Sequence, residues 1–400
     1  SGPYVKNNPS ETKYAILPFE RNDHIKKISV EVNQWDGSPT NISLSEIAFY
    51  EYNGVEDQID ALFANESKTK LAEGVDEQTI NQLREQLNAT QDFYIDSDIL
   101  KDELNLAEQL LQNNTSALGI VMDGIQSRDT TGDVRVLNTL QPIGAVANSG
   151  KKIVVYAEIP EGESVTLVPT QFYAESNSWK GTPIALQNGR NVITMPTMTS
   201  LSAEKGGSLY LQYSGSNADR IKLQIRGNVT KIPMLELSDW ESMSEQQRKE
   251  KITNYVEELN TYVAALGSNN LQTNIRNATE ISLPYVLLSL PADQVQSGIS
   301  GASSTEAKVE RLYQNTLAWN QLMELMYRTH GVDDITTEAS RNNIRYQRMF
   351  SGAFMYAAGE HIGVEYGSTA PLVQGIPAGS AGFGEESLFG WGIAHEIGHN

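Results

Sequence analysis

The start of the chain alternates apolar and polar residues, which is the pattern of half-buried β-strands. Ile28, Val30 and Val32 are separated by polar positions, and Asp36–Pro39 supplies a turn before the alternation resumes. Because strands of this kind pack one face on a core, we expect residues 1–54 to be the closing strands of a β-sandwich.

From about residue 55 the apolar positions change to helical spacing. Ile80, Leu83 and Leu87 recur at intervals of three and four residues and therefore share one helix face. Acidic residues are dense here, and such a charge run is typical of a solvated face. We predict a helical, acidic linker region over residues 55–136.

Short apolar runs at regular spacing return over residues 137–232. Ile153–Tyr156 is followed by a turn and a further strand, and Asn188-Gly189 separates Ile184–Leu186 from Val192 and Ile193. An Asn-Gly pair between two apolar runs is a strong signal for a β-hairpin. The range 137–232 is therefore predicted to be a second β-sandwich.

Two long helices are predicted after residue 233. Ser242 and Glu245 have the spacing of a capping box, and the apolar face that follows ends at Gly267. A second capping pattern at Ser303–Glu306 opens a helix that ends at Gly331. Between them, Ile281–Leu290 is broken by Pro284 and predicts a strand that enters a loop.

Composition narrows the classes of partner. The chain has 400 residues, enough for about two to four domains. Its 30 basic and 50 acidic residues give a formal net charge of −20, which argues against nucleic acid or an anionic membrane. It has no cysteine, so disulfides and thiolate zinc sites are excluded. No apolar run approaches the roughly 20 residues that span a bilayer.

The last residues carry the candidate chemistry. His395 and His399 flank Glu396 in the spacing His-Glu-x-x-His. Residues four apart lie on one helix face, so both imidazoles can bind one metal ion. Zinc suits two nitrogen ligands, a further protein ligand and one open position for water. Because the chain has only five histidines, a chance match at this spacing is improbable.

Glu396 is placed to act on that water. Zinc lowers the pKa of a bound water to about 7, and a nearby carboxylate can take its proton as the water attacks a carbonyl. The expected reaction is peptide hydrolysis without a covalent intermediate. A helix would fray if it ended one residue after its metal-binding turn. We therefore expect this chain to be the front part of a longer protein, with the third ligand beyond residue 400.

The order of parts and the motif Gly-Trp-Gly-x-x-His-Glu-x-Gly-His-Asn at 390–400 resemble the M60-like (enhancin-like) zinc metallopeptidases. The acidic segment from Leu62 to Val75 is similar to bacterial members, and the resemblance covers roughly residues 60–400. It implies an α+β multidomain protein in which β-sandwich modules precede a mainly helical, gluzincin-like zinc peptidase domain. That domain would occupy residues 233–400 here and be truncated just after the motif.

The same resemblance implies residue roles. His395 and His399 would be zinc ligands, Glu396 the general base, and a downstream glutamate the third ligand. A cluster ahead of the motif in the family lies near the cleft, and the comparable stretch here is Phe354–His361. Substrate contacts are therefore expected in this region and beside the motif, at Tyr356, Glu360, His361 and Trp391.

Members of the family degrade mucins and other O-glycosylated proteins and commonly carry carbohydrate-binding modules. The segment Ser45–Tyr50 resembles the last strand of discoidin-like, carbohydrate-binding modules, although a small structural β-unit explains residues 1–54 equally well. The resemblance implies a secreted or cell-surface bacterial enzyme that recognises glycans. Two alternatives remain open: a zinc protease that is indifferent to sugar, and a glycan-binding adhesin with a relict zinc site.

Overall fold

The computed structural model of the chain divides into two compact units. One contains residues up to 62 together with 74–112, and the other contains 63–73 together with 113–400. The structure describes residues 54–90, 96–128, 137–171, 179–196, 206–268, 270–302, 304–332, 340–347, 354–374 and 392–400. The strands predicted within residues 1–53 lie outside these ranges.

The first unit is helical. Its helices are α1 (Val55–Asp60), α2 (Glu77–Thr90) and α3 (Ser97–Leu111). Ile80, Leu83 and Leu87 are buried along one face of α2, as their spacing predicts. Arg84 Nη2 lies 2.7 Å from Glu108 Oε2, which joins α2 to α3. The predicted helical linker over 55–136 is only partly helical, because a strand begins at Ile120.

Two antiparallel sheets share one apolar core in the second unit. The first sheet has the order β1-β8-β3-β6, with β1 (Ile120–Asp123), β8 (Lys222–Gly227), β3 (Lys152–Glu158) and β6 (Gly189–Thr194). The second has the order β5-β4-β7-β2-β9, with β5 (Ile184–Ala185), β4 (Ser164–Pro169), β7 (Gly206–Ser214), β2 (Gln141–Asn148) and β9 (Val229–Lys231). Inward side chains such as Val155 from β3 and Leu211 from β7 belong to this core.

The hairpin predicted around Asn188-Gly189 is wrong. Strand β5 pairs with β4 and strand β6 pairs with β3, so the chain crosses from one sheet to the other at this point. The Asn188 side chain accepts a hydrogen bond from the Ile159 amide at 2.9 Å, and Gly189 has φ +91°. Asn188 therefore bonds a main-chain amide and Gly189 adopts a positive φ, as these residue types favour in turns. The turn, however, connects two different sheets and does not form a two-residue hairpin.

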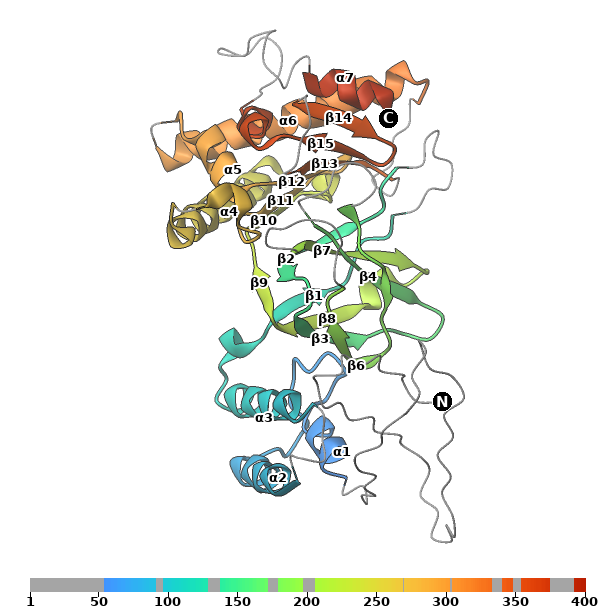
Figure 1. Cartoon of the computed structure of the whole chain (residues 1–400), viewed down its shortest axis with the longest axis vertical. Helices are drawn as coiled ribbons and strands as arrows, with labels where there is room; N and C mark the ends of the chain where they lie inside the picture. Colours follow the sequence, from blue (N-terminus) through green and yellow to red (C-terminus); the bar gives the residue numbers. More distant parts are fainter. Residues whose placement is uncertain are drawn as a thin grey trace, which may run out of the picture. The chain divides into compact units, whose positions relative to one another are not determined.

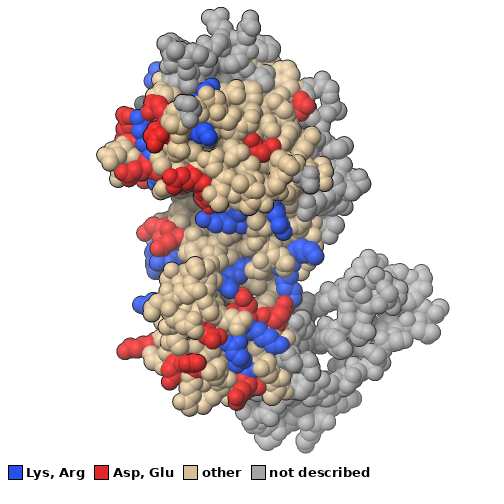
Figure 2. Space-filling view, turned by 90° about the vertical axis from the view of Figure 1, so that its left-hand side faces the viewer, with Lys and Arg blue, Asp and Glu red and all other residues tan. Residues whose placement is uncertain are grey.

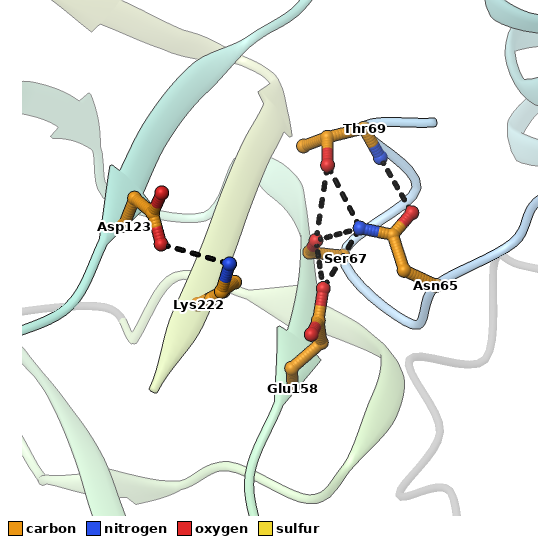
Figure 3. Close-up of polar contacts among 6 residues, drawn as sticks. All are labelled: Asn65, Ser67, Thr69, Asp123, Glu158 and Lys222. Carbon is orange, nitrogen blue, oxygen red and sulfur yellow. Dashed lines mark hydrogen bonds and ion pairs between the residues drawn. The ribbon is translucent and has the colours of Figure 1, made fainter. Parts of the chain in front are cut away.

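The segment 63–73 is fastened to β3 by a small polar cluster (Figure 3). Asn65 Nδ2 lies 2.9, 2.8 and 2.8 Å from Ser67 Oγ, Thr69 Oγ1 and Glu158 Oε1. Ser67 Oγ donates to the same carboxylate oxygen at 2.5 Å. Every polar atom in these contacts has a partner within the cluster, so the arrangement is typical of a loop clamp.

A six-stranded mixed sheet forms the rest of the second unit. Its order is β10-β11-β12-β13-β15-β14, with β10 (Met234–Glu236), β11 (Thr279–Ser282), β12 (Val286–Leu290), β13 (Asn342–Tyr346), β15 (His361–Val364) and β14 (Met355–Ala358). Strands β12, β13 and β15 run parallel to one another, and β14 is antiparallel to β15.

Helices cover one face of this sheet (Figure 1). They are α4 (Glu245–Leu266), α5 (Ala292–Ile299), α6 (Thr305–Thr329) and α7 (Gly392–His399). Their buried residues share a core with Leu288, Ile344 and Ile362 of the sheet. The opposite face packs through Leu287 on Tyr210 of β7 and on Trp179. The sheet therefore separates the helices from the two antiparallel sheets.

The predicted α+β class is confirmed, and the region after residue 233 holds a six-stranded sheet beside its helices. The stretch Ile281–Leu290 forms two antiparallel strands instead of one strand and a loop, with the turn at Pro284. The capping box of α4 uses Ser244 and Gln247, two residues after the predicted pair. Gly267 ends that helix as predicted.

Surface charge is mixed on the face shown in Figure 2, where Lys and Arg are interspersed with Asp and Glu. This fits a chain whose charges do not form a track for nucleic acid on that face. Within the described ranges, no helix combines the length and apolar content needed to cross a lipid bilayer.

Candidate metal centre

Helix α7 presents the two motif histidines on its outer side. Ile393 and Ile397, four residues apart, are buried in the core shared with α6 and the sheet. Gly398 lies close to α6, where an added Cβ would come 3.4 Å from Met326 Cε. With this side of the helix fixed, His395 and His399 are exposed.

The two imidazoles converge as a pair of metal ligands must. Their Nε2 atoms are 3.1 Å apart, and the ring planes are 89° apart with centroids separated by 4.7 Å. Two nitrogens bound tetrahedrally at 2.0–2.1 Å to one zinc ion would be about 3.3 Å apart. The residues therefore fit zinc without a change of backbone. Glu396 follows His395 in the helix and is half-buried.

A complete ligand set is not assembled by the described residues. Among them, no group of three or more His, Cys, Asp or Glu side chains could hold a metal ion. His395 and His399 supply two donors, whereas a catalytic zinc site uses three protein ligands. Within the described ranges, the motif therefore supplies two of the ligands that such a site needs.

Tyr356 and His361 lie on the face of the sheet opposite α7. Ile362 and Ile344 pair across β15 and β13 and belong to the core on the helix side. Successive side chains of a strand point to opposite faces, so His361 and its pair Asn343 point the other way. The structure therefore does not bring the His361 ring together with His395 and His399.

His361 is enclosed by aromatic rings. Its Nε2 lies 3.0 Å from the Tyr356 hydroxyl, and its centroid lies 5.2 Å from that of Trp179. Burial, together with the positive charges of Arg345 and Lys180, lowers the pKa of His361 to about 3. A buried, neutral histidine in these contacts is typical of a structural residue.

The remaining predicted substrate contacts are also placed. The Tyr356 ring lies across Gly363, where an added Cβ would come 2.0 Å from Tyr356 Cε1, so only glycine leaves room for it. Glu360 forms an ion pair with Lys180 at the surface. Trp391 lies outside the described residues. Substrate contact by these four residues stays a prediction, and the geometry favours a structural role for Tyr356 and His361.

Solved structures show the same fold. One holds the CBM32-1, CBM32-2 and M60 catalytic domains of ZmpB from Clostridium perfringens; it is 22% identical, with a TM-score of 0.60 over 88% of this chain and 35% of that chain. A second ZmpB metallopeptidase structure from that organism is 21% identical, with a TM-score of 0.51 over 70% of this chain and 52% of the other.

A metallopeptidase from Bacteroides thetaiotaomicron is 14% identical, with a TM-score of 0.52 over 83% of this chain and 49% of that chain. The chain has the M60 metallopeptidase fold. The resemblance drawn from the motif is thus confirmed for the fold, although no protein-family model and no curated protein matches the sequence. This chain spans between about a third and a half of these three structures.

In this M60 fold, the end of α7 makes polar contacts that the sequence did not reveal. Asn400 Nδ2 donates to Asn342 Oδ1 at 2.8 Å and lies 3.4 Å from the main-chain oxygen of His361. Asn400 is buried although it follows an exposed histidine. In the sequence, the position of Asn400 next to His399 was the signal for a role at the motif. Its partners could not be predicted, because they lie on two strands that are distant in the sequence.

The six-stranded sheet carries a row of buried polar residues on the face away from α7. The buried polar row consists of Glu280, Ser289, Asn343 and Arg345 from this sheet, together with Tyr210 of β7. Tyr210 and Ser289 donate to the carboxyl oxygens of Glu280 at 2.8 and 2.7 Å. Asn343 donates to Ser289 Oγ at 2.9 Å, and Arg345 donates to Asn343 Oδ1 at 3.2 Å. Burial raises the pKa of Glu280.

Proposed function

We propose that the chain belongs to a secreted, zinc-dependent bacterial endopeptidase that hydrolyses peptide bonds in mucins or other O-glycosylated proteins. The observation that carries the proposal is the pair of Nε2 atoms of His395 and His399, which lie 3.1 Å apart on an outward helix face. The M60 metallopeptidase fold around this helix supports it. In the proposal, the third ligand is a glutamate after residue 400.

The residues present fit the chemistry of metal-assisted hydrolysis. Zinc bound there would lower the pKa of a water and polarise the substrate carbonyl. His395 and His399 would hold the metal through Nε2, while the buried Ile393 and Ile397 keep their helix in place. The Glu396 carboxylate accepts the proton of the attacking water and passes it to the leaving amine.

The substrate class rests on the resemblance to enzymes that degrade O-glycosylated proteins. The ZmpB structure has two CBM32 domains beside its M60 catalytic domain. In this chain, the strand pattern of residues 1–54 resembles discoidin-like, carbohydrate-binding modules at Ser45–Tyr50. We therefore assign residues 1–54 to a glycan-binding module that holds the substrate near the peptidase.

Replacing Glu396 with Gln tests the mechanism. The full-length Glu396→Gln protein should still bind zinc, because both imidazoles remain, but its turnover should fall by several orders of magnitude. Glu310→Gln is a matched control, since Glu310 is exposed and pairs with Lys249 on a helix surface. Turnover by Glu396→Gln equal to that of the control would refute the assignment of the general base.

Digestion of an O-glycosylated mucin tests the substrate. The full-length protein would be incubated with the mucin before and after enzymatic removal of its glycans, each with and without a chelator. Cleavage that needs both sugar and metal is expected. Metal-dependent cleavage that survives deglycosylation would favour the sugar-indifferent protease. Glycan binding without any cleavage would favour the adhesin.

A further inference from the structure

The C-terminal end of α7 makes directional contacts in addition to the apolar packing of the helix. Ile393 and Ile397 pack in the apolar core, and such contacts are non-directional. Asn400, by contrast, is 8% exposed and donates from Nδ2 to Asn342 Oδ1 on β13 at 2.8 Å. The same nitrogen lies 3.4 Å from the His361 carbonyl oxygen on β15.

These contacts bear on the metal site because of where Asn400 lies in the sequence. Asn400 directly follows His399, and consecutive Cα atoms are held 3.8 Å apart, so contacts that fix Asn400 also restrict the backbone at His399. His395, one helical turn earlier, lies between the two buried isoleucines along the helix. Loss of the amide contacts would therefore displace His399 relative to His395 and change the separation of their Nε2 atoms.

We propose that Asn400 is a positioning residue for the metal site. Together with Asn342 and the main chain of His361, it sets the orientation of His399 toward the metal. The inference rests on the proposed function, because it presumes that His395 and His399 bind zinc. Residues that orient metal ligands typically contribute 10- to 100-fold to metal affinity.

The test measures zinc affinity in the full-length protein by competition with a chromogenic chelator. Asn400→Ala and Asn342→Leu should each weaken zinc binding about tenfold. Asn342→Leu conserves volume, so it serves as the second variant if Asn400→Ala does not fold. The double variant should bind zinc about as weakly as Asn400→Ala alone, because Asn400→Ala already removes the contact with Asn342.

A matched control separates positioning from general destabilisation. Asn315 is buried on α6, and its Nδ2 donates to the Leu372 carbonyl at 3.0 Å. Asn315→Ala should lower the melting temperature with and without zinc by the same amount. In the Asn400 and Asn342 variants, the increase in melting temperature produced by zinc should shrink.

The outcomes distinguish the two proposals. A wild-type protein that binds no zinc would overturn the proposed function itself. A wild-type protein that binds zinc, together with Asn400 and Asn342 variants of unchanged affinity, would overturn only the positioning role. Equal losses of melting temperature with and without zinc would also overturn it, because they would show a structural role alone.

Discussion

At the scale of the residue, the burial of His361 makes the stability of the folded state depend on pH. Its pKa is about 3 in the folded protein, against an ordinary value of 6.5. Between these values the unfolded chain binds a proton that the folded chain does not. The folded state therefore loses stability as the pH falls from 6.5 toward 3. One such group changes the free energy of unfolding by at most about 1.4 kcal/mol per pH unit.

Replacing His361 with Gln should flatten this dependence. The Gln amide can still bond the Tyr356 hydroxyl but cannot take up a proton in the unfolded chain. We expect the slope of the unfolding free energy between pH 6.5 and 4 to decrease by up to about 1.4 kcal/mol per pH unit. Urea unfolding at a series of pH values measures this slope. The difference in unfolding free energy between variant and wild type at pH 8 reports the packing cost alone. An unchanged slope would contradict the burial of a neutral ring.

The motif residues could be predicted from sequence, whereas the contacts of His361 could not. The pairing of His395 with His399 follows from helical periodicity alone, which is a local property. The direction of His361 depends on which face of β15 meets the helices, and that is decided by strands far away in the chain. Glu360 and His361 are neighbours in the sequence, but Glu360 forms a surface ion pair with Lys180 whereas the His361 ring is buried.

At the scale of the element, helices were predicted better than short strands. The face of α2 and the end of α4 follow from spacing and from local capping chemistry. Strands β12 and β13 are buried at every position, so they lack the alternation that marks half-buried strands. Their polar residues, such as Asn343, find partners only in the assembled sheet.

The start of α4 offers a test of this local chemistry. Ser242 and Ser244 both have Glu or Gln three residues later, and the structure uses Ser244, whose side chain accepts from the Gln247 amide. Ser242 Oγ instead donates to the Asp239 carbonyl at 2.9 Å. Ser244→Ala should therefore lower the free energy of unfolding by about 1 kcal/mol, as loss of an N-cap typically does.

A hydroxyl elsewhere on the same helix is the control. Thr261 Oγ1 donates only along its own helix, to the Glu257 carbonyl at 3.0 Å, and alanine is the better helix former. Thr261→Ala should change the free energy of unfolding by less than about 0.5 kcal/mol. Chemical denaturation followed by circular dichroism compares both variants. If Ser242→Ala proved the more costly serine variant, the capping position would be wrong.

At the scale of the whole molecule, the buried polar row joins parts of the chain that are distant in sequence. Tyr210 belongs to the antiparallel sheets, whereas Glu280 and Ser289 belong to the six-stranded sheet. Burying a polar group is costly unless it is hydrogen-bonded, so each member needs the others in place. No local pattern predicts such a row, because its members are brought together only by the packing of one sheet on another.

Through Glu280, the stability of the folded chain changes with pH in the direction opposite to the change that His361 causes. Burial raises the pKa of Glu280 above its ordinary 4.5, although Ser289, Tyr210 and Arg345 partly offset the shift. The folded chain therefore holds a proton that the unfolded chain releases. Stability from this group is complete below pH 4.5 and is lost as the pH rises through the folded pKa. Together, His361 and Glu280 favour a stability maximum between the acid and alkaline extremes.

Glu280→Gln should move that maximum to higher pH. The Gln side chain can still accept from Tyr210 and donate to Ser289, and it releases no proton on unfolding. Melting temperatures of wild type, Glu280→Gln and the control Glu258→Gln, whose partly exposed carboxylate forms an ion pair with Lys231, would be compared across pH 4 to 9. We expect the Glu280 variant alone to lose less stability toward alkaline pH. If its profile instead paralleled that of the wild type, the Glu280 carboxyl would be ionised in the folded chain, and its attraction to the positive charge of Arg345 would stabilise the row.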